Sequence, residues 1–171
     1  MPTWRPLTPN DIASLMQVAN EIHPGLPERP EVFINRIALF PAGCLALEDE
    51  AEDEDGARLC GYAISHPIRP RCPPALDSVL DEIPADADHY YIHDVAILPR
   101  LRGRGLAAEC VARLLASDAA QRYPMAALVS VYGTEAFWAR FGFRAVVMGE
   151  DLAGKLREYG EDAVYLERVQ G

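Results

Sequence analysis

The chain has 171 residues, of which 50% are hydrophobic and 25% are charged, a composition typical of one globular domain with a single buried core. Its formal net charge of −10 argues against a nucleic-acid-binding protein, because such proteins present a basic surface. No apolar run approaches the length of a membrane-spanning helix, and the first residues lack a basic segment followed by an apolar one. We therefore expect a single cytoplasmic domain over residues 1–171 that contacts neither nucleic acid nor membrane.

Hydrophobic periodicity divides the chain into helices and strands. Apolar residues at helical spacing predict helices, and runs of β-branched and aromatic residues predict strands. In chain order, the expected elements are a strand (3–8), a helix (8–23), a second helix (30–40), two strands (43–48 and 57–68), one short helical turn (76–80), a strand (89–98), a helix that begins after Gly105 and ends before Pro124, a strand (126–131), a short helix (134–141) and two strands (144–148 and 162–169). This order predicts an α/β fold in which a mixed sheet is flanked by helices.

Two compositional features have simple interpretations. Seven acids occupy the eight positions 48–55. We expect them to form a solvated hairpin loop, with attraction of a cationic substrate as the alternative. The four cysteines, Cys44, Cys60, Cys72 and Cys110, lack the spacing of a zinc site, so we expect free thiols and no bound metal.

The turn after the strand at 89–98 combines positive charge with backbone freedom. It contains Arg100, Arg102, Gly103, Arg104 and Gly105, directly before a predicted helix. A helix N-terminus exposes unpaired backbone N–H groups at the positive end of the helix dipole, and glycine lets a ligand approach the backbone closely. We therefore interpret the turn as an anion-binding site suited to a pyrophosphate.

Part of this turn also fits the dinucleotide-binding pattern G-x-G-x-x-G/A, with Gly103, Gly105 and Ala108 at the defined positions. In the dinucleotide-binding fold the first glycine follows the strand almost directly, and an acid ends the next strand. Here residues 99–102 intervene, and the next strand ends in VSVYG without an acid. An NAD(P)-binding protein is therefore the less favoured interpretation.

Two segments together resemble the GCN5-related N-acetyltransferases, the GNAT superfamily. The segment VAILPRLRGRGLA resembles the acetyl-coenzyme A loop of that family, R/Q-x-x-G-x-G/A, with Arg100, Gly103 and Gly105 at the defined positions. The segment EAFWARFGF, residues 135–143, resembles the family's F-Y-x-x-x-G-F helix. The resemblance implies a GNAT-like fold, a mixed and mostly antiparallel sheet of about six to seven strands with helices on both faces.

The resemblance also implies acetyl-CoA as the cofactor and indicates the residues that hold it. Backbone N–H groups of the turn and the helix start would bind the pyrophosphate. The preceding strand would pair with the pantetheine arm, and two aromatic residues would line the thioester. The implied cofactor-binding residues are Val95, Ala96, Ile97, Arg100, Leu101, Arg102, Gly103, Arg104, Gly105, Leu106, Ala107, Phe137 and Trp138.

Acetyl transfer to an amine needs a general base, because an ammonium group has no lone pair with which to attack. By resemblance the base lies two or four residues before Val95, which indicates His93 or Tyr91. Histidine titrates near neutral pH, so His93 suits this role, with a purely structural histidine as the alternative. Strand alternation places both candidates on the face of Val95 and Ile97, and places Asp94 on the opposite face in a structural role. The Ile97 N–H is expected to stabilise the oxyanion.

The general acid is left open by one departure from the family pattern. Trp138 stands where the family often has a tyrosine that protonates the leaving thiolate, and an indole N–H can only donate a hydrogen bond. Tyr132 or solvent could supply this proton instead.

The expected acceptor is a primary amine of a small molecule or a peptide. By resemblance the segment that joins the first two helices walls the acceptor site, so His23 and Glu28 are candidates for substrate contact. The family frequently dimerises, which makes a homodimer a further expectation. The alternatives to an N-acetyltransferase are a non-catalytic acyl-CoA-binding module, which Trp138 keeps open, and the NAD(P)-binding protein.

Overall fold

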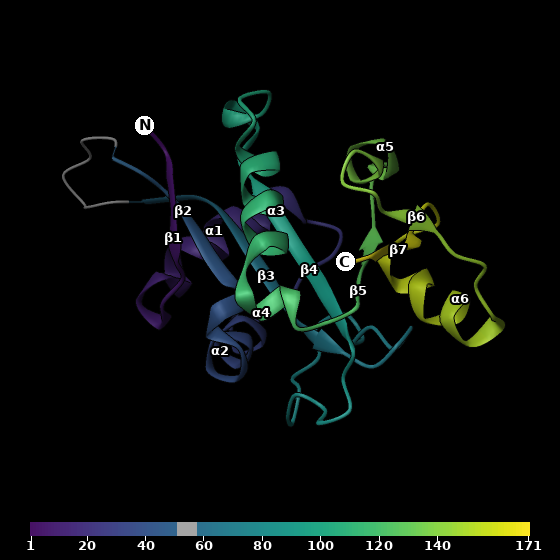
Figure 1. Ribbon diagram of the computed structural model, residues 1–171. Helices are drawn as coiled ribbons and strands as arrows, with labels where there is room; N and C mark the ends of the chain where they lie inside the picture. Colours follow the sequence, from purple (N-terminus) through teal and green to yellow (C-terminus); the bar gives the residue numbers. More distant parts are fainter. Residues whose placement is uncertain (51–57) are drawn as a thin grey trace.

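The computed structural model describes residues 1–50 and 58–171, and in this part of the chain seven strands form one mixed sheet (Figure 1). The strand order is β1-β2-β3-β4-β5-β7-β6, with β4 and β5 parallel and the other neighbours antiparallel. The strands are β1 (Thr3–Pro6), β2 (Cys44–Asp49), β3 (Arg58–Ile68), β4 (His89–Ile97), β5 (Met125–Ser130), β6 (Arg144–Ala145) and β7 (Val164–Val169). The expected mixed, mostly antiparallel sheet is confirmed. Residues 51–55 of the expected hairpin loop, four of them acidic, lie outside the described residues.

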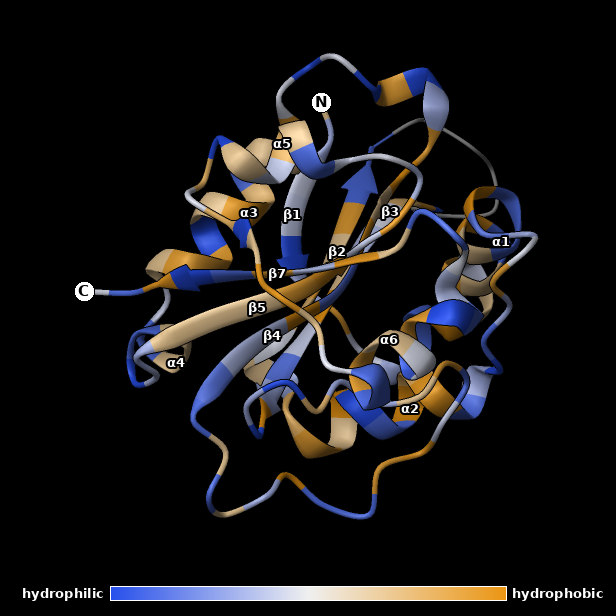
Figure 2. Ribbon diagram, turned by 90° about the vertical axis from the view of Figure 1, so that its right-hand side faces the viewer, coloured by the Kyte–Doolittle hydropathy of each residue, from blue (hydrophilic) through white to orange (hydrophobic). Residues whose placement is uncertain are grey.

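Helices cover both faces of the sheet, with α3, α4 and α5 on one side and α1, α2 and α6 on the other (Figure 2). The apolar side chains of α3 form one core with β4, and those of α1 and α2 form another with β3. The α-helices are α1 (Ile12–Ile22), α2 (Pro30–Leu39), α3 (Leu106–Ala116), α4 (Asp118–Gln121), α5 (Glu135–Ala139) and α6 (Glu150–Leu156), and the 3-10 helices are η1 (Pro9–Asp11), η2 (Pro41–Gly43), η3 (Pro99–Leu101) and η4 (Arg157–Tyr159). Within the described ranges, no helix is both long and apolar enough to cross a membrane.

The helix expected between Gly105 and Pro124 is divided in two. Helix α3 ends at Ala116 because Ser117 is extended, with φ −65° and ψ 149°. The Ser117 hydroxyl accepts a hydrogen bond from the Ala120 N–H and so caps α4. A side chain that caps a new helix offers the backbone an alternative to continuing the old one.

Two other segments differ from the prediction. The helical turn expected at 76–80 is absent: Asp77 has a positive φ of 58°, and its carboxylate accepts a 2.8 Å hydrogen bond from the Arg29 N–H. Helix α6 was not predicted. It buries only Leu152 and Leu156, and two apolar positions give little periodic signal.

A β-bulge in β4 changes the direction of its side chains. Asp94 faces Ile64 of β3, but the next paired residue of β4 is Ile92, so His93 is an extra residue in the ladder. Ile92 and Ile97 consequently pack in the same core under α3, although residues five apart in a regular strand lie on opposite faces. The predicted alternation, which separated Asp94 from His93, is therefore wrong beyond Ile92.

Strands β4 and β5 pair over only part of their length. Their parallel register joins His89–Ile92 to Met125–Leu128 and then stops. Beyond Ile92 the two strands spread apart, β4 towards the start of α3 and β5 towards α5 (Figure 1). The sheet is therefore open at the end where the arginine-glycine turn lies.

Candidate functional site

A cavity of about 900 Å³ occupies the opening between β4 and β5. Its walls are β4 from Ile92 to Ile97, the turn and first residues of α3, the end of α1, and α5 with the loop before it. Eleven of the thirteen expected cofactor-binding residues line it, namely Val95, Ala96, Ile97, Leu101, Arg102, Gly103, Gly105, Leu106, Ala107, Phe137 and Trp138. The fold thus places residues of both family motifs, the glycine turn and the segment 135–143, around one cavity.

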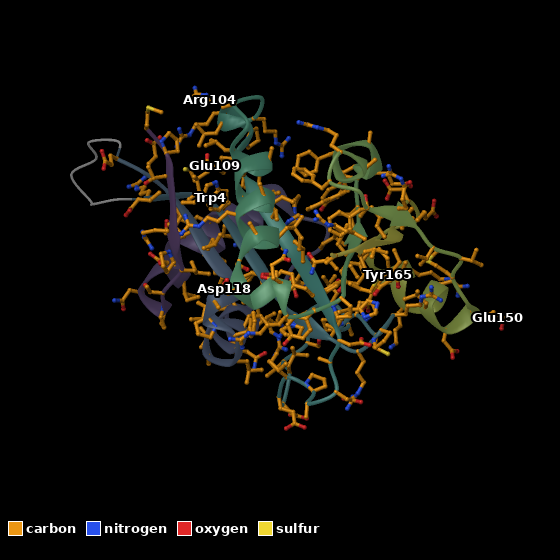
Figure 3. All side chains as sticks on the ribbon, in the orientation of Figure 1. Trp4, Arg104, Glu109, Asp118, Glu150 and Tyr165 are labelled. Carbon is orange, nitrogen blue, oxygen red and sulfur yellow. The ribbon has the colours of Figure 1, made fainter. Side chains whose placement is uncertain are left out.

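Two of the expected residues lie elsewhere. The guanidinium of Arg100 points towards β2, with Nη1 3.3 Å from a carboxylate oxygen of Asp49. Arg104 is exposed at the tip of the turn, beyond the part of α3 that carries Glu109 (Figure 3). Arg102 lines the cavity, and a cation that was not predicted joins it, Arg140, whose guanidinium lies 5.8 Å from the centre of the Phe137 ring.

The turn before α3 has the geometry of an anion site. Gly103 and Gly105 have positive φ values of 79° and 76°. Gly105 is the N-cap of α3 and supplies no side chain to bond the helix start. The first backbone bond that closes the helix runs from the Glu109 N–H to the Gly105 carbonyl at 3.0 Å. The N–H groups of residues 106–108 therefore have no partner within the helix and remain available to an anion.

Strand β4 presents a free backbone edge to the cavity. The Leu98 N–H donates to the Cys60 carbonyl at 2.9 Å, which fixes which residues of β4 bond to β3. In an antiparallel ladder the residues between two bonded positions point their N–H and C=O groups the other way. Val95 and Ile97 thus direct these groups away from β3 into the opening, where β5 no longer pairs.

Three acid–base side chains from separate parts of the chain meet at the cavity wall. His23 follows α1, Asp94 lies on β4, and Tyr132 lies in the loop after β5. Nε2 of His23 lies 3.0 Å from Oδ1 of Asp94, and Nδ1 lies 3.0 Å from the Tyr132 hydroxyl. The second Asp94 oxygen accepts a 2.6 Å hydrogen bond from the Tyr62 hydroxyl.

This arrangement shifts the pKa values of its members. Burial disfavours a charge on His23, but the adjacent Asp94 carboxylate outweighs burial, so the pKa of His23 is raised. Burial also disfavours a charge on Asp94, yet His23 and the Tyr62 hydrogen bond outweigh it, so the pKa of Asp94 is lowered. Asp94 therefore stabilises the imidazolium that forms when His23 takes up a proton.

Sequence reasoning placed only one member of this trio, Tyr132, among the catalytic candidates. Asp94 was expected to point away from the site, and the bulge at His93 brings it to His23 instead. No local pattern marks the trio. The available signal was that His23 lies in the segment expected to wall the acceptor site.

His93 lies at the cavity, but its side chain is only 3% exposed. Its Nε2 lies 2.7 Å from a carboxylate oxygen of Glu28, which can only accept, so Nε2 carries the hydrogen. Its other nitrogen, Nδ1, is buried and has no hydrogen-bond partner among the described residues. In a neutral ring that buried nitrogen is the basic one, so the lone pair of His93 faces the interior.

Tyr91 is not brought to the cavity. Its side chain is fully buried in the core between β5 and α6, with Ala127 and Leu152. Burial raises the pKa of Tyr91 well above its ordinary value, so its hydroxyl keeps its proton. It packs 6.1 Å from the His93 ring, measured between ring centres.

A mixed sheet that opens between two parallel strands, with a glycine turn and an uncapped helix start at the opening, defines an α/β fold with an anion-binding geometry at its open end. The family model described as the Acetyltransferase (GNAT) family matches residues 12–143. The chain belongs to the GNAT acetyltransferase family.

Solved structures share this fold at low sequence identity. The chain is similar to a GNAT-like decarboxylase, GphF, in complex with isobutyryl-CoA (TM-score 0.77, 14% identity, 98% of each chain covered). It is also similar to the NatC complex bound to Gag peptide and CoA (TM-score 0.70, 16% identity, 99% of each chain) and to Ard1 from Thermoplasma volcanium (TM-score 0.68, 16% identity, 98% of this chain and 97% of that one). No curated protein matches the chain.

Proposed function

We propose that the protein transfers an acetyl group from acetyl-CoA to a primary amine of a small molecule or a peptide. The observation that carries this proposal is the unpartnered start of α3 beside the open edge of β4, around one cavity. Two of the similar structures hold CoA or isobutyryl-CoA, and one holds a peptide as well. Acetyl-CoA supplies an activated thioester to the site.

Different residues of the cavity would contact different parts of acetyl-CoA. N–H groups of residues 103–108 would bind the pyrophosphate, with Arg102 and Arg140 adding positive potential. The free edge of β4 at Val95 and Ile97 would bond the amide groups of the pantetheine arm, as an added strand does. Phe137 and Trp138 form the apolar wall of this path, with their ring centres 5.0 Å apart.

Calorimetric titration with acetyl-CoA tests the cofactor, with NADH and NADPH in parallel. We expect binding of acetyl-CoA alone, and Gly103→Glu should abolish it because a carboxylate would enter the anion site. Gly103→Asn separates charge from backbone strain, since asparagine tolerates a positive φ. Gly154→Glu, on α6 and with no atom within 4 Å of its added Cβ, is the matched control. Unchanged affinity in Gly103→Glu, or preference for a dinucleotide, would reject the assignment.

The non-catalytic acyl-CoA-binding module is separated from the enzyme by one further measurement. Both bind acetyl-CoA, but only a transferase releases free coenzyme A when an amine is present. Trp138 is buried against Phe143, with a ring-centre distance of 5.8 Å, so it packs in the core. A transferase would therefore need another residue to donate the proton to the leaving thiolate.

A further inference from the structure

We propose that Tyr132, His23 and Asp94 form the proton relay of the transferase, with Tyr132 as the catalytic group that touches the amine and the thioester sulfur. His23 holds the transferred proton, and Asp94 positions and stabilises the imidazolium. The inference rests on the proposed function and adds the acid–base machinery to it.

The hydrogen-bond directions support the relay. The Asp94 carboxylate can only accept, so Nε2 of His23 carries a hydrogen and, in the neutral ring, Nδ1 has the lone pair. That lone pair faces the Tyr132 hydroxyl at 3.0 Å. A hydroxyl bonded to a histidine that is itself oriented by a buried carboxylate is the recurring arrangement of groups that exchange protons with a substrate.

Tyr132 is placed to reach a ligand. It lines the cavity and is 54% exposed, whereas the other members are largely covered, with side-chain exposures of 14% for His23 and 13% for Asp94. Its backbone has a positive φ of 56°, a conformation that costs a bulky residue energy. In this conformation the phenol lies over His23, with the two rings stacked at 5.7 Å between centres.

The competing base, His93, is turned away from this path. Its hydrogen-bearing nitrogen is committed to Glu28, and its other nitrogen is buried without a partner among the described residues. Glu28 also adds negative charge near His23 and helps to raise the pKa of that ring. The Glu28 carboxylate therefore helps to stabilise the imidazolium form of His23.

The relay balances the protons of the reaction. The Tyr132 oxygen takes a proton from the ammonium form of the acceptor as its own hydroxyl proton moves to His23 Nδ1. The freed nitrogen forms a bond to the thioester carbonyl carbon, the C–S bond breaks with its electron pair on sulfur, and the second amine proton leaves to water. The proton on His23 then returns through Tyr132 to the sulfur, so the products are an amide, a thiol and one released proton.

Two probe amines test the relay in the full-length protein. Methylamine is protonated near neutral pH and must lose a proton before it attacks, whereas hydroxylamine is uncharged there and attacks directly. With acetyl-CoA as donor and methylamine as acceptor, Tyr132→Phe and His23→Gln should lower the kcat of thiol release by about 100-fold. The loss with hydroxylamine should be much smaller, and the Kd of acetyl-CoA should stay within about twofold, which also shows that the variants fold.

Matched controls remove similar groups outside the cavity. His89→Gln deletes a histidine that is 2.7 Å from a carboxylate oxygen of Asp88 at the other end of β4, and Tyr123→Phe deletes a hydroxyl near α4. Both should leave thiol release unchanged. Equal losses with the two amines, or no loss, would overturn the relay alone. A wild-type protein that binds acetyl-CoA without releasing thiol in the presence of methylamine would support the non-catalytic module and overturn the transferase and its relay together. Failure to bind acetyl-CoA would overturn the proposed function with it.

Discussion

The indole N–H of Trp4 donates a 3.0 Å hydrogen bond to the carbonyl oxygen of Leu106, which lies 102 positions further along the chain. Trp4 is on the edge strand β1, and Leu106 is the first residue of α3. A second bond, 2.9 Å from Arg113 Nη1 to the Trp4 carbonyl, joins the same two elements. The first strand of the sheet thus holds the helix whose start lines the cavity.

We expect Trp4→Phe to lower both stability and ligand affinity. The variant keeps an aromatic ring in the core but leaves the Leu106 carbonyl without the indole donor, which should reduce the free energy of unfolding by about 1–2 kcal/mol. Urea denaturation measures this loss, and calorimetry measures the affinity for acetyl-CoA. A variant as stable as the wild type would show that the bond contributes nothing.

The two arginines on either side of Gly103 should differ in their effect on binding. Arg102 lines the cavity and Arg104 does not. Arg102→Gln should weaken acetyl-CoA binding roughly tenfold at low salt, equivalent to about 1.4 kcal/mol, and the loss should shrink as salt is added. Arg104→Gln is the control from the same turn and should have little effect. Equal losses would mean that the turn contributes only general positive potential.

Asp94→Asn should lower the pKa of His23. In the wild type the Asp94 carboxylate outweighs the effect of burial, which acts in the opposite direction. An amide carries no charge, so burial then dominates and the pKa of His23 should fall below its ordinary value of 6.5. NMR titration of the His23 ring in both proteins measures the change. An unaltered titration would contradict the contact between the two side chains.

His66 should make the fold sensitive to acid. Burial lowers its pKa to about 3, against an ordinary value of 6.5, so the folded protein keeps this ring neutral. The unfolded chain binds a proton at His66 below pH 6.5 and the folded chain does not. This contribution to stability is therefore complete above pH 6.5 and is lost as the pH falls towards 3, by roughly 2–3 kcal/mol at pH 4.5.

The His66→Gln variant isolates that contribution. The substitution should cost stability at all pH values, because the site is buried, but the dependence on pH between 4.5 and 7 should become shallower than in the wild type. Denaturation curves at several pH values give the two slopes. Parallel slopes would assign the acid sensitivity to other groups.

Gly61 is needed by the strand that lines the cavity. A Cβ at this position would lie 2.7 Å from the Ala96 carbonyl oxygen of β4 and 3.2 Å from the Leu47 side chain. Gly61→Ala should therefore destabilise the fold by about 1–3 kcal/mol and weaken acetyl-CoA binding, since β4 must move. Gly154→Ala, inside α6 where an added Cβ meets no atom within 4 Å, should leave binding unchanged and should not destabilise the fold, because alanine favours a helix more than glycine does.

The geometry of the proposed anion site could be predicted from the sequence because its information is local. A strand, a glycine turn and a helix follow one another within residues 89–116, and the proposed anion site uses only the backbone of that segment. Residue types at fixed spacing were sufficient for this half of the site.

The proton-transfer half could not be predicted in the same way. His23 and Asp94 are 71 positions apart, and His23 and Tyr132 are 109 apart, so only the packed fold brings them together. The direction of Asp94 depends on a single extra residue in β4, and a bulge changes no composition or periodicity that the sequence displays. Strict alternation therefore failed at the position where it was needed.

The short parallel ladder between β4 and β5 also has a mechanical consequence. Among the described residues, these four register pairs, His89–Ile92 with Met125–Leu128, are the only strand pairing that joins β1–β4 to β7 and β6 through β5. The sheet is thus two halves that share one narrow seam, with the cavity directly beyond its end. A ligand that contacts both strands across the opening would hold the two halves of the sheet together. The sheet should therefore become more rigid when the cavity is occupied.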